Sequence, residues 1–222
     1  MVWAWRSWWW SLFKSKLQQR KHPHWEPVEN LELVEKQLFE NATVENKTAL
    51  GFDTEFTSSA SDPNEHTLAL IQVASDDCVY LLGVCYFRNA NKMGMLEQLV
   101  TKIFKSSTFV VFDYAAKIDF RLLRNEFESL PDESYYFIDL EYVKKSNNLS
   151  KYLEKEKVTN SKGVKVSGLS KLCLQTLGTS LDKKEQMSDW TRSPLREKQV
   201  TYAALDAACL LKIYHKFNTK PR

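Results

Sequence analysis

Apolar residues recur along the chain with two different periods, and this pattern divides most of it into helices and strands. Spacings of three and four residues are typical of a helix that buries one face. They predict helices over residues 28–41, 95–104, 116–127, 168–177 and 193–217. Short apolar runs between polar turns are typical of strands. Such runs occur at residues 49–56, 68–74, 78–84, 109–112 and 136–138.

The order of these elements predicts the fold class. The runs at 68–74 and 78–84 are separated only by Ser75-Asp76-Asp77, which indicates a hairpin, so the first three strands should form an antiparallel meander. The continuous apolar run at 109–112 is typical of a strand buried on both faces. Three strands followed by alternating helices and strands predict an α/β domain with helices on both faces of a central sheet.

Capping residues mark the last two predicted helices. Gly178 follows the apolar pattern of residues 168–177 and is expected to end that helix. Ser193 is a predicted N-cap, with Pro194 at the first helical position of a helix that continues to about Phe217.

Before these helices, residues 144–167 contain seven lysines, a density typical of a solvated surface segment or, alternatively, of a rim that contacts phosphates.

Residues 1–27 differ in composition from the rest and form a Trp-rich, basic extension to a domain at residues 28–222. Six of the seven tryptophans lie in the first 25 residues, which contain no Asp or Glu. Arranged as a helix, residues 3–17 would place tryptophans on one face and polar residues on the other. This is typical of a membrane-surface anchor or an organelle-targeting segment, and the alternative is an unstructured start. Its apolar part is too short to span a bilayer.

Composition limits the chemistry. The chain has 222 residues, 43% hydrophobic and 27% charged, which suits one soluble domain with a sizeable core. A net charge of +3 does not by itself indicate a nucleic-acid binder. The four cysteines form no Cys-x-x-Cys pair, which argues against zinc and against a disulfide framework and fits a reducing, intracellular compartment. Cytoplasmic location is favoured, with a mitochondrial or membrane-associated one possible through the extension. Any metal site must then be built from carboxylates.

Asp53 and Glu55 are the first candidates for such a site. On a strand over residues 49–56 they point to one face, while Phe52, Thr54 and Phe56 point to the other. Two carboxylates held side by side repel each other, and a fold tolerates this when a cation lies between them. Oxygen ligands of this kind are preferred by Mg²⁺ and Mn²⁺. A single Asp-x-Glu is more often a solvated strand end, so partners are required.

Two other segments supply further acids. Tyr202 and Asp206 are four residues apart on the last predicted helix, so they stack on one face of it. Asp119 lies one turn into the helix that follows the strand at 109–112 and should project towards the end of the sheet.

Taken together, this pattern resembles the DEDD superfamily of 3′–5′ exonucleases, in its tyrosine subgroup, which has the ribonuclease D-like fold. Residues 70–73, 168–172, 181–190 and 192–195 also resemble the sequences that flank the family's motifs. These flanks are most similar to Nibbler-type small-RNA trimming nucleases, then to Werner-type exonuclease domains and ribonuclease D. Thr201 stands where the sister subgroup has histidine, which supports the tyrosine assignment. The Gly, Asn or His that the family usually has near residues 113–115 is missing, which makes Asp113 a rival to Asp119. Asp119 is favoured because Leu123 follows it as in the family pattern.

The resemblance implies a ribonuclease H-like mixed sheet, with the first three strands antiparallel and the next parallel, and a two-metal-ion site. Asp53 would bridge two divalent cations, Mg²⁺ or Mn²⁺. Glu55 and Asp206 would complete the cation that carries the attacking water, and Asp119 would hold the one at the leaving oxygen. Tyr202 would orient or help deprotonate that water.

The resemblance also implies a substrate. This is the 3′ end of a single-stranded nucleic acid, from which nucleoside monophosphates are released. Thr54 and Phe56 could contact its terminal nucleotide, although packing of the strand's other face is the simpler interpretation of Phe56. RNA is the expected substrate. The alternatives are DNA, hydrolysed by the same mechanism, and a non-catalytic nucleic-acid-binding module.

Overall fold

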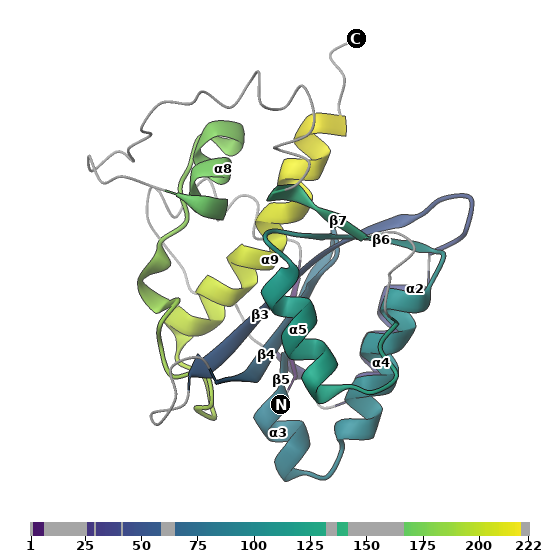
Figure 1. Cartoon of the computed structure of the whole chain (residues 1–222). Helices are drawn as coiled ribbons and strands as arrows, with labels where there is room; N and C mark the ends of the chain where they lie inside the picture. The colour runs from purple at the N-terminus through teal and green to yellow at the C-terminus, as the bar shows by residue number, and fades with distance from the viewer. Residues whose placement is uncertain are drawn as a thin grey trace.

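A computed structural model shows the chain as a central sheet with helices on both faces (Figure 1). It describes residues 2–6, 26–28, 30–40, 42–58, 65–131, 137–141 and 167–218. Within these residues the sheet has the strand order β2-β1-β5-β4-β3-β6-β7. The strands are β1 (Val2–Arg6), β2 (Glu26–Val28), β3 (Thr48–Ser58), β4 (His66–Ala74), β5 (Cys78–Gly83), β6 (Phe109–Asp113) and β7 (Phe137–Asp139).

The strand directions confirm the predicted mixed sheet. β3 pairs with β4, and β4 with β5, in antiparallel fashion. β6 lies parallel to the other side of β3, and β7 lies parallel to β6. β3 is therefore at the junction of the antiparallel and parallel parts, with neighbours on both sides. This central position makes it a rigid base for the side chains it carries.

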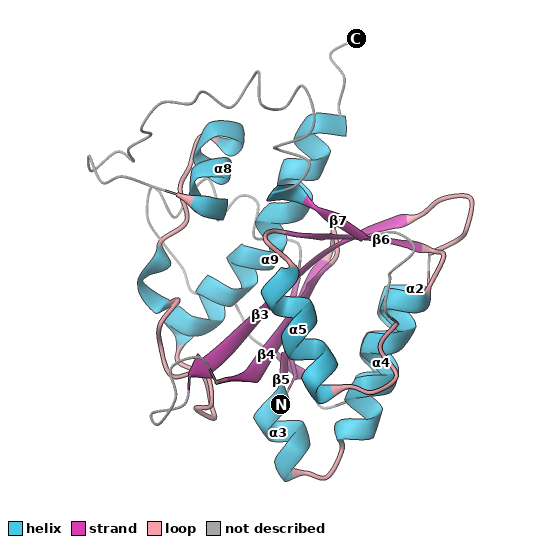
Figure 2. Cartoon of the chain, in the orientation of Figure 1, coloured by secondary structure: helices cyan, strands magenta, loops and turns pink. Residues whose placement is uncertain are grey.

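Helices cover the two faces of the sheet in two groups (Figure 2). On one face lie α2 (Leu31–Phe39), α3 (Val84–Asn89), α4 (Met93–Lys105) and α5 (Lys117–Glu126). On the other lie α8 (Gly168–Leu177) and α9 (Glu197–Asn218), with the short 3₁₀ helix η1 (Lys183–Glu185) between them in sequence. Gly178 ends α8 in a left-handed conformation, as predicted.

Each face of the sheet contributes to its own apolar core. Val34, Phe52 and Phe104 belong to the core beneath α2 and α4, where the Phe52 and Phe104 rings meet edge to face with centroids 5.0 Å apart. Leu172 and Ala207 belong to the core between the sheet and the α8–α9 pair. Because successive residues of a strand point to opposite faces, β3 contacts both cores.

Residues 2–6 correct one prediction. Val2–Arg6 form β1, which pairs antiparallel with β5, and Glu26–Val28 form β2 at the edge of the sheet. The helical arrangement expected for residues 3–17 is thus wrong at residues 3–6, where backbone pairing with the open edge of β5 fixes an extended chain. Residues 7–17 lie outside the described residues, so contact with a membrane surface stays a prediction. In the part of the chain that is described, every helix is too short or too polar to cross a bilayer.

The last helix also begins later than predicted, at Glu197 instead of Pro194. The side chain of Gln199 fixes this start: its Oε1 accepts the Arg196 backbone N–H at 3.1 Å, as in one half of a capping box. Its Nε2 donates to the Asp189 carbonyl at 2.7 Å. Gln199 is fully buried, so these bonds tie the first turn of α9 to the preceding loop.

Candidate active site

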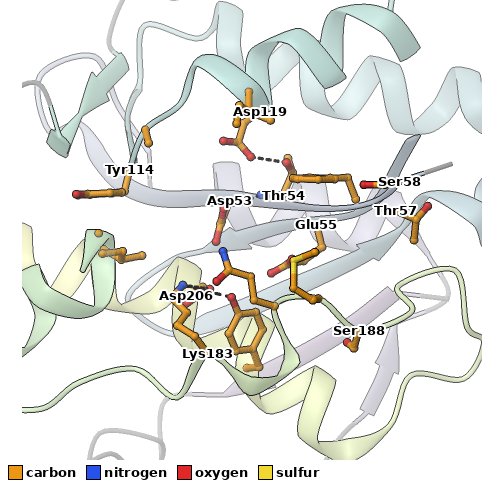
Figure 3. A pocket seen from close by; sticks show the side chains of 18 of the residues that line it. Asp53, Thr54, Glu55, Thr57, Ser58, Tyr114, Asp119, Lys183, Ser188 and Asp206 are labelled. Carbon is orange, nitrogen blue, oxygen red and sulfur yellow. Dashed lines mark hydrogen bonds and ion pairs between the residues drawn. The ribbon is translucent and has the colours of Figure 1, made fainter. Parts of the chain in front are cut away.

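A cleft of about 840 Å³ opens where β3 runs between α5 on one side and α9 on the other (Figure 3). Every residue that the sequence singled out as a preferred site residue lines it. These residues are Asp53, Thr54, Glu55, Phe56, Asp119, Tyr202 and Asp206. Three elements far apart in the sequence thus meet at one place, as the family resemblance led us to expect.

The strand β3 presents Asp53 and Glu55 towards α9. Asp206 approaches them from that helix, and one carboxylate oxygen from each of the three lies within 4.8 Å of the others. Glu55 and Asp206 are 6% and 2% exposed, so these charges are largely removed from water. The register of β3 shifts between Glu55 and Phe56, at the mouth of the cleft.

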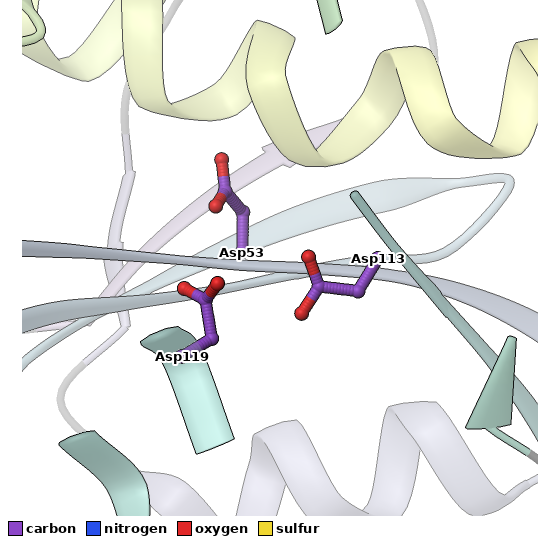
Figure 4. Close-up of side chains that lie close together, drawn as sticks. All are labelled: Asp53, Asp113 and Asp119. Carbon is purple, nitrogen blue, oxygen red and sulfur yellow. The ribbon is translucent and has the colours of Figure 1, made fainter. Parts of the chain in front are cut away.

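A second group of carboxylates forms on the side of α5 and shares Asp53 with the first. Asp53, Asp113 and Asp119 also bring one oxygen each within 4.8 Å of one another (Figure 4). From the sequence, Asp113 and Asp119 were alternatives for one ligand position, whereas the structure brings both into the cluster. Asp119 comes from the first turn of α5 and Asp113 from the end of β6.

Thr54 holds two of these acids in place. Its hydroxyl donates a hydrogen bond to Asp119 Oδ1, and its backbone N–H donates to Asp53 Oδ1 at 2.9 Å. The side chain is 5% exposed although it lines the cleft. Phe56 is half-buried, packs against the core and contacts the His66 ring in a tilted arrangement, with ring centroids 4.5 Å apart. Contact of Thr54 and Phe56 with a nucleotide stays a prediction.

The loop after β6 contains the sequence's departure from the family pattern. Ala115 adopts a φ of 63°, a left-handed conformation that glycine adopts without strain and that costs other residues roughly 1–2 kcal/mol. Its N–H donates to Asp139 Oδ1 at 3.0 Å, which holds the loop against β7. The turn between β6 and α5 is thus made without the Gly, Asn or His that the resemblance led us to expect.

Lys183 is a member of the site that the sequence analysis missed. Its Nζ lies 2.9 Å from Asp206 Oδ2 and donates to the Tyr202 hydroxyl at 3.2 Å. It projects from η1, a single turn with no apolar period from which its direction could be deduced. The one available signal was its position inside residues 181–190, which resemble the family. Tyr202 is held from behind by Trp190, with ring centroids 5.8 Å apart.

Crowding of acids in a buried place changes their proton affinities. Burial, followed by the negative charges of Asp119 and Asp206, raises the pKa of Asp53 well above its usual range. Burial and the neighbouring Asp53 raise the pKa of Glu55 to about 10, and burial raises that of Asp119 to about 6. Burial and the charge of Asp206 raise the pKa of the Tyr202 phenol. The cluster therefore requires protons or cations.

The donor atoms of the cluster suit a hard divalent cation. All of its ligands are carboxylate oxygens, which Mg²⁺ and Mn²⁺ prefer over nitrogen or sulfur. Two buried oxygens, Asp206 Oδ1 and Asp113 Oδ2, have no hydrogen-bond partner among the described residues. A buried polar atom is normally satisfied, so these two are available to a bound ion.

The fold and the site together define a class of protein: an α/β protein with a ribonuclease H-like sheet and an acidic cleft. The chain matches the model of the 3′–5′ exonuclease family over residues 32–221, and it belongs to that family. The resemblance to the ribonuclease D-like DEDD exonucleases, noted from the motifs, is thereby confirmed.

Individual relatives agree with this assignment. An Aedes aegypti protein named exonuclease mut-7 homolog is 28% identical over 179 residues, which are 76% of this chain and 23% of that protein. Ribonuclease D of Cronobacter turicensis is 28% identical over 183 residues, which are 81% of this chain and 42% of the enzyme. The crystal structure of the Aedes aegypti Nibbler EXO domain superposes with a TM-score of 0.63 at 24% identity, covering 85% of this chain and 84% of that domain. The chain thus spans less than half the length of these two curated relatives.

Proposed function

We propose that the chain is a divalent-metal-dependent 3′–5′ exonuclease that releases nucleoside monophosphates from the 3′ end of single-stranded RNA. The observation that carries this proposal is the pair of carboxylate triads that share Asp53 at an open cleft. Two adjoining groups of oxygen ligands match the two-metal sites of phosphoryl-transfer enzymes. Membership of the exonuclease family supports the same reaction class.

The acids on the α9 side would hold the cation next to the attacking water, and Asp119 with Asp53 the cation next to the leaving 3′ oxygen. When bound, such cations lower the pKa of water and neutralise the charge that develops on the leaving oxygen. The protein holds the carboxylate ligands in fixed positions. Asp119 cannot turn away without losing its hydrogen bond from Thr54, and Asp53 is held by the backbone of the same residue.

Tyr202 would orient the attacking water. A phenol has an ordinary pKa of about 10, so it keeps its proton at neutral pH and acts through hydrogen bonds, not as an anionic base. Its ring is packed against Trp190 and its hydroxyl faces Lys183, so the direction of the O–H group is restrained from both sides.

The rim of the cleft offers apolar surface for bases. Ile118 and Met187 line the cleft and are 45% and 88% exposed, unusual values for large apolar side chains. Exposed apolar groups next to a carboxylate cluster suit a strand whose bases are unstacked and whose phosphate approaches the acids. Such contacts tolerate any base, which fits stepwise removal of terminal nucleotides.

RNA is favoured over DNA because ribonuclease D is among the relatives. The proposal is tested with RNA and DNA oligonucleotides of one sequence, both labelled at the 5′ end, in Mg²⁺ or Mn²⁺. We expect an RNA ladder that shortens from the 3′ end and stops on chelation. A ladder with DNA alone would favour the alternative substrate. Binding of both without hydrolysis would favour a non-catalytic module.

Lys183 gives a prediction about cation binding. Its ammonium pairs with an Asp206 oxygen that the cation would use. We expect Lys183→Ala to strengthen Mn²⁺ binding by about 10-fold, or about 1.4 kcal/mol, because a repelling charge is removed and a ligand atom is released. Titration calorimetry with Mn²⁺ measures this.

The matched control is Lys184→Ala. Lys184 changes the net charge equally, but its side chain is 80% exposed and pairs with Asp182 at 3.5 Å. We expect no change in Mn²⁺ affinity for this variant. If both variants shift the affinity by the same factor, the effect comes from net charge and the role given to Lys183 is wrong.

A further inference from the structure

Asp113 is the most buried acid of the cluster and has no assigned role. It is the last residue of β6 and is 1% exposed, although the cleft itself is open. Figure 4 shows its carboxylate directed towards Asp119 and Asp53. The alternation along β6 explains this direction: Phe112 packs with the α8–α9 core, so the next side chain points to the face that α5 covers.

The immediate contacts of Asp113 leave its charge uncompensated. One oxygen accepts the backbone N–H of Tyr114, and the other has no hydrogen-bond partner among the described residues. Its strongest charged neighbours in the described part of the chain are Asp119, Asp53 and Asp139, all of them acidic. Lys183 pairs with Asp206, which belongs to the other triad. A buried carboxylate without a partner is costly, and a fold keeps one only where something compensates it.

We propose that Asp113 is a direct ligand of the second divalent cation, which it holds together with Asp53 and Asp119. This inference rests on the metal dependence of the proposed function and adds a fifth carboxylate to the four that the family pattern assigns. The geometric support is that one oxygen from each of the three residues lies within 4.8 Å of the others, which also holds for the triad on the α9 side. The unpartnered Asp113 oxygen supplies the vacant lone pair.

A third carboxylate has a specific consequence for the order in which the cations and the nucleic acid bind. A cation held by Asp53 and Asp119 alone would depend on the substrate's phosphate for further negative charge. Asp113 supplies that charge from the protein, so both cations should bind before the nucleic acid does. Since affinity for hard cations rises with the number of charged oxygen ligands, we expect the second cation to bind tightly in this chain.

The test compares Mn²⁺ binding to the full chain and to Asp113→Asn without nucleic acid, by titration calorimetry and by electron paramagnetic resonance of free Mn²⁺. For the unaltered chain we expect two bound ions. For Asp113→Asn we expect one of the two to bind at least ~10-fold more weakly and the other to be unchanged. Asn keeps the shape of Asp and removes a repelling charge, so the variant should fold. Asp113→Ser provides the same comparison if it does not.

Asp139→Asn is the matched control. Asp139 is the register partner of Asp113 on β7, but its carboxylate accepts the N–H groups of Ala115 and Glu141 at 3.0 and 2.8 Å. Asp139→Asn removes one negative charge, as Asp113→Asn does, but from the neighbouring strand. We expect both Mn²⁺ ions to bind to it as they bind to the unaltered chain.

Two ions bound equally well by Asp113→Asn and by the unaltered chain would overturn the proposal, and Asp113 would then be a buried acid of the core. Equal losses in Asp113→Asn and Asp139→Asn would overturn it as well, because they would show a general effect of charge. This readout is independent of hydrolysis. If the unaltered chain binds two ions, Asp113→Asn weakens one of them and no oligonucleotide is degraded, the proposed function fails while the ligand role of Asp113 stands.

Discussion

Asp53→Asn is expected to reduce removal of 3′ nucleotides by at least ~1000-fold, equivalent to about 4 kcal/mol of lost transition-state stabilisation. The reason is that Asp53 belongs to both carboxylate triads. An amide carries no charge to share between the two cations of the proposed site, so the binding of both cations would be weakened at once. The rate of shortening of a 5′-labelled RNA in Mn²⁺ measures the loss.

The same substitution should stabilise the metal-free protein, and the gain should grow with pH. The pKa of Asp53 is raised in the folded chain above its unfolded value, so its contribution to stability is present at low pH and is lost as the pH rises through the folded pKa. Asn avoids this loss. The free energy of unfolding of Asp53→Asn minus that of the unaltered chain should be small near pH 4 and larger near pH 8, measured by urea denaturation in a chelator.

Asp76→Asn serves as the control for both measurements. Asp76 is exposed, lies outside the cleft and contacts His215 at 2.7 Å. It should keep full activity and show no comparable gain in stability. An active Asp53→Asn variant would remove Asp53 from the mechanism. A variant that is inactive but less stable than the unaltered chain at pH 8 would instead indicate that Asp53 has a structural role.

The parts of the site that could be predicted from the sequence are those whose direction follows from a regular period. Asp53 and Glu55 share a face because a strand repeats every two residues, and Tyr202 and Asp206 share one because a helix repeats every 3.6. The same rules placed Asp119 in the first turn of α5. The meeting of the three elements was inferred from the family resemblance and is now seen in the cleft.

The remaining features depend on contacts between segments far apart in the sequence. Lys183 reaches Asp206 from a turn without periodicity, and its long side chain could point in several directions. The start of α9 was misplaced because Ser193 and Pro194 match the local capping pattern, whereas in the structure the buried Gln199 bonds to the backbone of Arg196 and of Asp189. The burial of Tyr202 and Asp206, which are 6% and 2% exposed, has the same kind of cause, because η1 and β3 enclose that side of α9.

Gly51 determines how closely α9 approaches β3. A Cβ atom added at Gly51 would lie 2.1 Å from the carbonyl oxygen of Ala207 and 3.1 Å from its carbonyl carbon, both of them backbone atoms. Ala207 follows Asp206 directly, and Gly51 is two residues before Asp53. The absence of a side chain at Gly51 therefore sets the distance between the two elements that carry the α9-side triad.

Gly51→Ala is expected to destabilise the fold by about 3 kcal/mol or more, at the upper end of the usual cost of overpacking, because neither backbone segment can move without disturbing its hydrogen bonds. The relief available to the chain is to shift α9 away from β3, which carries Asp206 away from Asp53 and Glu55. We therefore expect a second effect: loss of Mn²⁺ affinity in the α9-side triad, with less change in the triad of Asp53, Asp113 and Asp119. Urea denaturation and Mn²⁺ titration measure the two effects.

Gly94→Ala is the matched control, since an added Cβ at Gly94 would meet no atom within 4 Å. Gly94 lies in α4, where alanine is the better helix former by up to about 1 kcal/mol, so this variant should equal or exceed the unaltered chain in stability. If Gly51→Ala were as stable as Gly94→Ala and bound Mn²⁺ normally, β3 and α9 would not approach as closely as the structure shows. A loss of stability with unchanged Mn²⁺ binding would mean that the clash is relieved elsewhere and that Gly51 does not position Asp206.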